Sequence, residues 1–422
     1  MTFSKLIKLA WRNLWRQKRR TILTLISIAM GGFLAVMMTG MQDYTWVDMI
    51  DTSARLGSGH ITIQHPEYLD KPTLSRTVTE TADKRATVES DKAVAVAVER
   101  ATGQAMLATA SDSFGAFFIA YDPTVESEYT LEWTDGLLEG ELFTQPDDRA
   151  IILGEVLAEN LDAEIGDKVV YTLTDRNGEI VSGMERLSGI ITTGSSATDA
   201  GIVLMPIDNV RDVVGYDPAE STQVAIFLNN GRRTLTVSER IDALIGPEAA
   251  VLTWDQMTPE IKSFIAMKKG GGLVMNLVIG ILIAAGIFNT IFMSVMERTR
   301  EFGVMMAVGY SPKQLFSLVM IESGFLAIMG LVASIAITAP LYFKLSETGL
   351  DMTATYRDMG VLDSHGSMDL AGVGLDPVLP FGLFPESAIA IVLAIVGATL
   401  LAGVYPAWKA GRIDPIESIN IV

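Results

Sequence analysis

The stretch "MERTREFGVMMAVGYSP", Met296–Pro312, joins two long apolar segments of the chain. It begins with four charged residues within five positions and then becomes apolar around Gly303 and Gly309. A short connector in water needs only polar residues, and this one places several apolar side chains after its charges. The role of the connector depends on which side of a membrane it occupies.

Four uncharged stretches reach the ~20 residues that a helix needs to cross a ~30 Å hydrocarbon core. They are Thr21–Met41, Gly270–Met296, Ser323–Phe343 and Ser387–Trp408. The first is interpreted as an anchor because its apolar run exceeds the ~7–15 residues of a signal peptide and no small-residue cleavage site follows. The chain has 422 residues and no cysteine, so disulfides and thiol chemistry are excluded. We predict an α-helical membrane protein with four transmembrane helices.

Charge predicts the topology of these helices. Residues 1–20 carry seven Lys/Arg and no acid, whereas residues 42–260 carry 15 basic and 38 acidic residues, a net charge of −23. Residues 297–314 have a net charge of +1 and residues 344–386 a net charge of −5. Because Lys/Arg-rich flanks stay in the cytoplasm, both termini and the 297–314 loop are expected inside.

Residues 3–20 have the pattern of a basic amphipathic helix. We expect a basic face of Lys5, Lys8, Arg12, Arg16 and Arg19, and an apolar face of Phe3, Ile7, Ala10, Trp11 and Leu14. Such a helix lies in the inner-leaflet interface, or serves only as a positive-inside anchor.

The segment between the first two helices alternates strand and helix patterns. "HITIQ" alternates like a strand, and Asn177-Gly178 is the strongest hairpin signal in the chain. We predict a large mixed α+β extracytoplasmic domain at roughly 60–250, inserted between helices one and two. Gly270-Gly271-Gly272 is either a hinge or a local break in the following helix.

Little in the sequence indicates an enzyme. The histidines, His60, His65 and His365, are isolated from other ligand types and are interpreted as surface or turn residues, so no metal site is expected. No P-loop motif occurs, and ATP hydrolysis is therefore expected on another chain. Glu322 follows the loop by only a few turns, and we expect a structural pair with a basic group or helix end.

The C-terminal half, "ERTREFGVMMAVGYSPKQLFSLVMIESGFLAIMG", resembles the FtsX-like permease domain of ABC transporters. The tail "YPAWKAGRIDPIESI" is similar to the closing pattern of that family, and "LAWRNLWRQKRRTILTLISIAMGGF" to its opening. "IILGEVLAENLDAEIGDKVVY" is similar to the outer domain of MacB and LolC/LolE types, and "GSGHITIQHPEY" favours the lipoprotein-releasing LolC/LolE type.

This resemblance implies a multi-pass permease of the cell inner membrane with a periplasmic outer domain. Its implied partners are a cytoplasmic ABC ATPase dimer carrying ATP and Mg, a second permease chain that is identical or homologous, membrane lipid, and a periplasmic or lipoprotein partner. The chain itself would bind no cofactor, no metal and no nucleic acid. The permease would extract or export a lipoprotein or other amphiphile by mechanotransmission. The alternative is a regulatory FtsX-like module that activates an envelope enzyme without transporting a substrate.

The resemblance also assigns roles to residues. In the 297–314 loop, the ATPase-coupling residues would be Glu297, Arg298, Arg300, Glu301, Phe302, Gly303, Met305, Met306 and Gly309, with Val304 in the same apolar group. The alternative for the charged residues is a solvated helix end with i,i+3 and i,i+4 ion pairs, which would not explain the apolar residues that follow. Apart from the resemblance, four aromatic residues of "AMLATASDSFGAFFIAY" are substrate-binding candidates or, alternatively, part of the core of the outer domain: Phe114, Phe117, Phe118 and Tyr121. No catalytic residue is expected.

The expected domain boundaries combine these predictions. They are a cytoplasmic helix (1–20), the first span (21–41), the outer domain with its stalks (42–260), a stalk with the second span (261–296), the coupling loop (297–314), the third span (315–343), a periplasmic loop (344–386), the fourth span (387–408) and a cytoplasmic tail (409–422).

Overall fold

The computed structural model describes residues 3–134, 136–362, 366–370 and 373–413. His365 and the end of the closing motif, residues 414–422, lie outside the described residues. The chain divides into two compact units. The helical unit comprises Met1–Thr45, Ala266–Leu350 and Pro380–Val422, and the sheet unit comprises Trp46–Ile265 and Asp351–Leu379.

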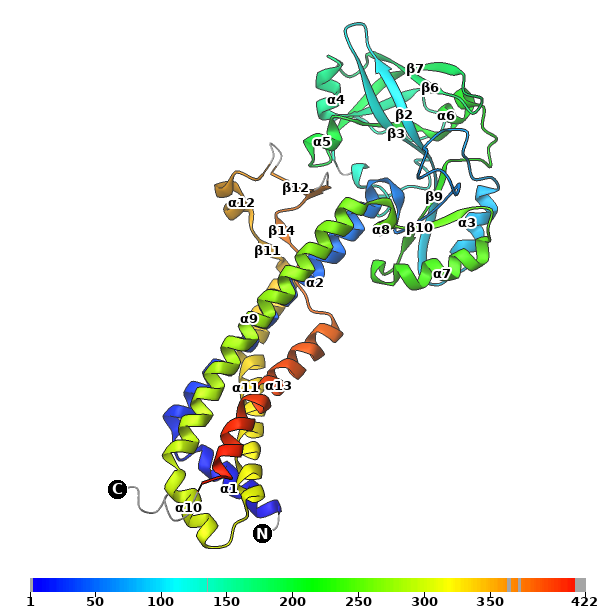
Figure 1. Ribbon diagram of the computed structural model, residues 1–422. Helices are drawn as coiled ribbons and strands as arrows, with labels where there is room; N and C mark the ends of the chain where they lie inside the picture. Colours follow the sequence, from blue (N-terminus) through cyan, green and yellow to red (C-terminus); the bar gives the residue numbers. More distant parts are fainter. Residues whose placement is uncertain (1–2, 135, 363–365, 371–372, 414–422) are drawn as a thin grey trace. The chain divides into compact units, whose positions relative to one another are not determined.

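The helical unit is built from six helices among its described residues (Figure 1). They are α1 (Phe3–Leu14), α2 (Lys18–Ser53), α9 (Pro259–Glu297), α10 (Thr299–Ala307), α11 (Pro312–Thr348) and α13 (Pro385–Ala410). Four helical segments are long and apolar enough to cross a membrane: Lys18–Ser58, Pro259–Glu297, Pro312–Thr348 and Pro385–Ala410. The four predicted membrane helices are thus confirmed. α2 and α9, with 36 and 39 residues, are longer than the ~20 residues of a span, so both continue beyond a bilayer.

α9 is continuous through its three consecutive glycines. The helix runs without interruption from Pro259 to Glu297, so the local break considered for Gly270–Gly272 is not found. An added Cβ would meet nothing within 4 Å at Gly270 or Gly271. Packing against the rest of this chain therefore does not require glycine at these two positions.

Ala10 and Leu14 of the predicted apolar face of α1 are buried, but Leu6 rather than Ile7 or Trp11 completes the buried stripe. Leu6, Ala10 and Leu14 are buried in a core cluster that includes residues of α11, whereas Ile7 and Trp11 are 36% and 42% exposed. The buried residues recur every four positions, which places them on one helix face. Contact with α11 selects this stripe, and sequence periodicity alone could not identify it.

The sheet unit contains ten strands in one mixed sheet among its described residues. They are β1 (Ile61–Gln64), β2 (Val94–Ala108), β3 (Ser113–Tyr121), β4 (Leu137–Gly140), β5 (Ala150–Gly154), β6 (Lys168–Thr174), β7 (Ile180–Ile191), β8 (Ile202–Pro206), β9 (Gln223–Leu228) and β10 (Ala250–Thr253). Their order is β10-β1-β9-β2-β3-β8-β5-β7-β4, and β6 pairs with β2 and β7. β3–β8 and β5–β7 are parallel, and the other pairs are antiparallel.

Short helices accompany this sheet. They are the π-helix Ala54–Ser58, α3 (Thr81–Glu89), α4 (Glu155–Asn160), α5 (Ser196–Asp199), α6 (Ile207–Val214), α7 (Thr234–Ile245), α8 (Trp254–Met257) and the 3-10 helices Glu132–Thr134 and Gly231–Arg233. The hairpin predicted at Asn177-Gly178 is confirmed, because β6 and β7 pair in register up to Thr174↔Ile180. Gly178 has φ +87°, a conformation that favours glycine in a tight turn.

The segment Asp351–Leu379 belongs to the sheet unit, although it has no periodic sequence pattern. It contains α12 (Thr353–Met359), β12 (Met368–Leu370), β13 (Val373–Leu375) and β14 (Val378–Leu379), and β14 pairs with β11 (Leu350–Asp351). Leu375 is buried with Met49, Ile50 and Ile261. The Ser195 hydroxyl donates to the Asp369 carboxylate at 2.5 Å. The segment is therefore packed against both helical and loop elements of the sheet unit.

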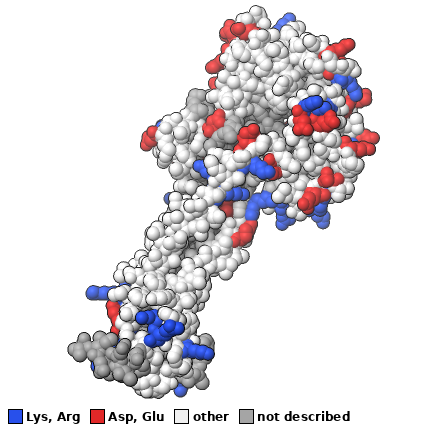
Figure 2. Space-filling model, viewed as in Figure 1, with Lys and Arg blue, Asp and Glu red and all other residues white. Residues whose placement is uncertain are grey.

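The surface charge differs between the two units. Figure 2 shows a long uncharged surface along the helices of the helical unit, with Lys and Arg at one end of it. On the visible face of the sheet unit, acidic side chains are scattered rather than gathered in one cluster (Figure 2). Among the described residues, no group of three His, Asp or Glu side chains could hold a metal ion.

Candidate functional site

The charged connector folds into a short helix whose end is set by a glycine. α10 spans Thr299–Ala307, and Gly309 follows with φ +101°. The backbone amide of Gly309 donates to the carbonyl oxygen of Met306, and the amide of Tyr310 donates to the carbonyl oxygen of Met305, both at 3.0 Å. This pair of hydrogen bonds is the Schellman motif, in which glycine is favoured at the left-handed position. Ser311 and Gln314 then form a capping box that starts α11.

We expect Gly309→Ala to lower the free energy of unfolding by about 1–2 kcal/mol, because a Cβ is disfavoured at a left-handed position. Thermal unfolding of the purified chain in detergent measures the change. Gly271→Ala is the matched control, since its added Cβ meets nothing within 4 Å and the residue lies within α9. Equal melting temperatures for both variants would contradict the role assigned to Gly309.

Glu322 is the buried centre of a network that connects three helices. Both Glu322 oxygens accept from Nη1 of Arg298, at 3.1 and 3.0 Å, and Oε1 also accepts from Asn13 at 2.8 Å. The side chains of Arg298 and Glu322 are only 10% and 11% exposed. The expected structural pair for Glu322 is confirmed. It connects α11 to α1 and to the junction between α9 and α10.

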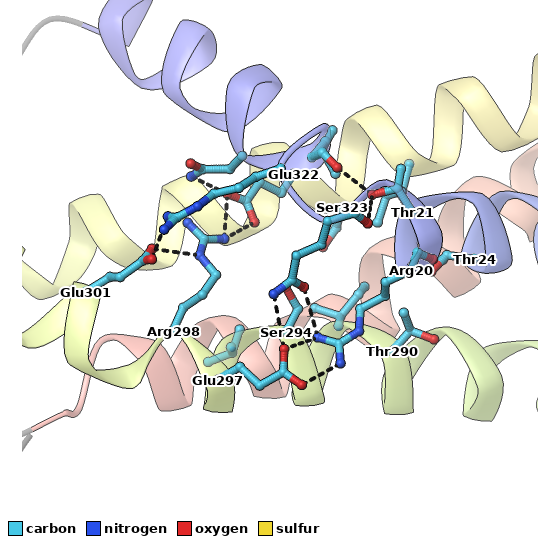
Figure 3. Close-up of a pocket in the computed structure, with 17 residues that line it drawn as sticks. Arg20, Thr21, Thr24, Thr290, Ser294, Glu297, Arg298, Glu301, Glu322 and Ser323 are labelled. Atoms are coloured by element: carbon cyan, nitrogen blue, oxygen red, sulfur yellow. Dashed lines mark hydrogen bonds and ion pairs between the residues drawn. The ribbon is translucent and has the colours of Figure 1, made fainter. Parts of the chain in front are cut away.

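The acidic residues of the connector, Glu297 and Glu301, pair with the start of α2 and the residues before it. Arg20 makes a bidentate contact with Glu297, at 2.7 and 2.6 Å, and Gln17 donates to the same carboxylate at 3.1 Å. Arg16 pairs with Glu301 at 2.5 Å, and Glu301 also accepts from Arg298 at 3.3 Å. Figure 3 shows Arg20 pointing toward Glu297, and Arg298 lying between Glu301 and Glu322.

These side chains surround a polar cavity of about 140 Å³. Its hydroxyl-bearing lining residues come from α2, α9 and α11: Thr21, Thr24, Thr290, Ser294 and Ser323 (Figure 3). Because a polar site of this size has room for water, the ion pairs border a region that water can enter.

α10 has one face directed inward and one directed outward. Phe302 and Gly303 are buried, Phe302 lies under Arg298 at 5.0 Å, and Met305 and Met306 pack partly against the same core cluster. The outward face contains Arg300, Val304, Ala307 and Val308, which we name the coupling face. The spacing i, i+4, i+7 and i+8 places these four side chains on one side of the helix. Val304 is 47% exposed and Val308 76%.

The structure thus separates the predicted coupling residues into two groups. Glu297, Arg298 and Glu301 take part in ion pairs within the chain, and Phe302 and Gly303 are in its core. Arg300 and Gly309 are exposed. Sequence reasoning missed the partners Asn13, Arg16, Gln17 and Arg20, because it assigned the basic residues before the first span to lipid. No local pattern in the sequence signals these pairs, because Arg20 and Glu297 are 277 positions apart.

The four aromatic candidates in β3 do not form one cluster. Phe118 and Tyr121 are buried in two different core clusters of the sheet unit. Phe114 and Phe117 are 37% and 44% exposed. Phe117 lines a hollow of about 410 Å³ together with Leu69 and Ile261.

A second, apolar cavity of about 360 Å³ lies among three helices of the helical unit. α2 contributes small residues such as Gly31 and Ala35, α9 contributes Leu277 and Ile283, and α13 contributes several alanines including Ala394. A cavity of this size and lining is typical of sites that bind apolar groups.

Two protein families match the chain. Residues 21–244 match the MacB-like periplasmic core domain, and residues 273–415 match the FtsX-like permease C-terminal domain. The first match covers more than half of the chain, and together the two include most of α2, most of the sheet unit, α10 and α11.

Several characterised and uncharacterised proteins are similar along the sequence. The lipoprotein-releasing system transmembrane protein LolC of Xylella fastidiosa is 23% identical over 65% of this chain, which spans 66% of that relative's length. An uncharacterized ABC transporter permease of Methanocaldococcus jannaschii is 23% identical over 100% of this chain and 98% of its own. The macrolide export ATP-binding/permease protein MacB of Hyphomonas neptunium is 23% identical over 98% of this chain and 60% of its own. The periplasmic region of MacB from Actinobacillus actinomycetemcomitans aligns with a TM-score of 0.35 and 14% identity, over 51% of this chain and 98% of that structure.

Proposed function

Because the chain belongs to the ABC transporter permeases of the MacB and FtsX-like type, we propose that it couples ATP hydrolysis on a separate ATPase chain to conformational change in its periplasmic sheet unit. The observation that carries this proposal is the division of α10 into an anchored face and an exposed one. An ordinary solvated connector has no need of a buried ion-pair network on one side and valines on the other.

The coupling face is the proposed docking surface for the ATPase. Val304 and Val308 would enter an apolar groove, and Arg300 would pair with an acidic residue at its rim. Apolar residues at the centre and charges at the rim are the usual arrangement of a protein interface. The partly exposed atoms of Met305 and Met306 would also contact the ATPase. Phe302 would hold α10 in position by packing in the core cluster of the helical unit.

The ion pairs around α10 would transmit a displacement of α10 to the long helices. Glu297 is the last residue of α9 and is held by Arg20 of α2, while Arg298 holds Glu322 of α11. Displacement of α10 therefore moves the starts of α2 and α11 and the end of α9 together. α2 and α9 both include residues of the two units, so each provides a continuous path between them.

This function requires α10 and both termini to lie in the cytoplasm. The charge of +7 in residues 1–20 supports that orientation by the positive-inside rule. The ATPase dimer, with its ATP and Mg, and a second permease chain complete the proposed assembly.

The proposed substrate is an amphiphile with an apolar chain, such as a lipoprotein. The apolar cavity among α2, α9 and α13 supports this substrate class, because its walls would bind hydrocarbon in preference to a polar solute. A relative named for lipoprotein release provides independent support.

Affinity purification from the native host in mild detergent tests the proposed function, with every co-purifying chain identified by mass. We expect an ABC ATPase together with this chain or with a second, different permease. An ATPase with an envelope enzyme and no ATP-dependent release of an amphiphile would favour the regulatory alternative. Recovery of the chain without any ATPase would overturn the proposal.

A further inference from the structure

The end of α2 enters the sheet unit through a segment that is not a regular α-helix. Ala54–Ser58 form a π-helix, and within it Gly57 has φ +148° and ψ −33°. Gly59 follows with φ +71°, and β1 begins at Ile61. A helix end of this kind can bend, and a bend here would absorb displacement of α2 before it reached the sheet.

Arg100 of β2 holds this segment in place from inside the sheet unit. Its Nη1 donates to the carbonyl of Gly57 at 2.7 Å. Gln223 of β9 donates to the same carbonyl at 2.9 Å. Arg100 and Gln223 are direct cross-strand partners, so two neighbouring strands hold one carbonyl oxygen of the segment.

Other contacts fix the position of Arg100 itself. Nε and Nη2 make a bidentate pair with Glu126 at 2.7 and 2.9 Å, and Nη2 also donates to the carbonyl of Thr130 at 2.7 Å. Arg100 is 0% exposed and Glu126 is 2% exposed. The guanidinium lies over the ring of Phe227 at 5.5 Å. The planar guanidinium group donates hydrogen bonds to all these acceptors at once, whereas the single amino group of a lysine cannot reach all of them.

His60 and Arg55 make further contacts in or beside the same segment. His60, which is 3% exposed rather than a surface residue, pairs with Asp51 at 2.8 Å and accepts from the amide of Leu228 at 3.2 Å. Arg55 pairs with Glu132 at 2.9 Å. The His60–Asp51 contact joins residues on either side of the segment, and Arg55 is held by its side chain, whereas Arg100 binds a backbone carbonyl inside the segment.

A buried ion pair adds little net stability compared with apolar residues of similar volume, so stability alone does not explain Arg100. We propose that Arg100 is a positioning residue that fixes Ala54–Ser58 to β2 and β9, so that displacement of α2 is transmitted to the sheet rather than lost in the π-helix. The transmission part rests on the proposed function. The immobilisation of the segment does not depend on it.

The test compares Arg100→Lys with Arg211→Lys in the full-length chain. Lysine keeps a positive charge beside Glu126 but lacks the Nη1 atom that donates to the carbonyl of Gly57. Arg211 is a matched control, since it pairs with Glu99 at 2.8 Å and Asp208 at 3.2 Å and its side chain is only 12% exposed. Within the part of the chain that the structure describes, it makes no hydrogen bond or ion pair with residues 54–58.

Hydrogen–deuterium exchange is the first measurement. We expect amides of residues 54–60 to exchange at least ~10-fold faster in Arg100→Lys, with no change in the rest of β2 and β9 and no change at 54–60 in Arg211→Lys. Unchanged exchange at 54–60 in Arg100→Lys would overturn the proposal. Faster exchange throughout β2 and β9 would also overturn it, because Arg100 would then be a general stabilising residue.

The second measurement uses the complex with its ATPase, with and without ATP. In Arg100→Lys we expect stimulated ATP hydrolysis within ~2-fold of the wild type, but loss of the ATP-dependent change in exchange that the wild-type sheet unit shows. An ATP-dependent change equal to that of the wild type would overturn the transmitting role. A wild-type complex with no ATP-dependent change would instead contradict the proposed function, and the first measurement would still decide whether Arg100 immobilises the segment.

Discussion

Val304→Asp combined with Val308→Asp is expected to abolish stimulation of the ATPase while leaving the chain folded and inserted. The two side chains are 47% and 76% exposed, so aspartate at either position remains solvated in the free chain. In the complex, each carboxylate would be buried in an apolar groove without a partner. A buried unpaired charge costs 2–5 kcal/mol or more, so two would weaken association by about 1000-fold or more.

ATP hydrolysis by the reconstituted complex, measured against the ATPase alone, checks this expectation. Ile180→Asp is the control, because Ile180 is also an exposed apolar side chain, at 80%, but belongs to the sheet unit. Stimulation should be normal in the control. If the double aspartate variant stimulated hydrolysis as the wild type does, the coupling face would not be the docking surface.

Met305 and Met306 are poorer choices for the same test, although the sequence pointed to them first. Both pack partly against the core cluster of the helical unit, so aspartate there would disturb folding as well as docking. The sequence predicts that apolar residues follow the charges in this connector. It does not predict which of them face inward, because that depends on packing in a core cluster that includes residues of α1, which is far away along the chain.

The same limit applies to the charged residues. The contact of Glu297, Arg298 and Glu301 with an ATPase stays a prediction from the resemblance, and the sequence did not show that they also pair within the chain. The four membrane helices and the 177–178 hairpin were predictable, because hydropathy and turn chemistry are local signals. The pairing of Arg20 with Glu297 joins residues 277 positions apart, and no local pattern contains it.

Arg298→Met is expected to lower the free energy of unfolding by about 3–5 kcal/mol, because it leaves the Glu322 carboxylate buried without its cation. Glu322 would retain only the hydrogen bond from Asn13, at 2.8 Å. Glu322→Gln should cost less, since the amide still accepts from Asn13, and Arg298 keeps Glu301 as a partner at 3.3 Å. Thermal unfolding in detergent should rank the two variants in this order.

The double variant Arg298→Met/Glu322→Met separates stability from coupling. Removing both charges avoids the unpaired carboxylate, so the melting temperature should return to near that of the wild type. If the ion pair only stabilises the fold, stimulation of the ATPase should return with it. We expect stimulation to remain low, because two methionines have no directional contact, whereas the Nη1 atom of Arg298 donates to both oxygens of Glu322 and so holds the start of α10 at one position along α11. Full recovery of stimulation in a stable double variant would show that packing alone transmits the displacement of α10.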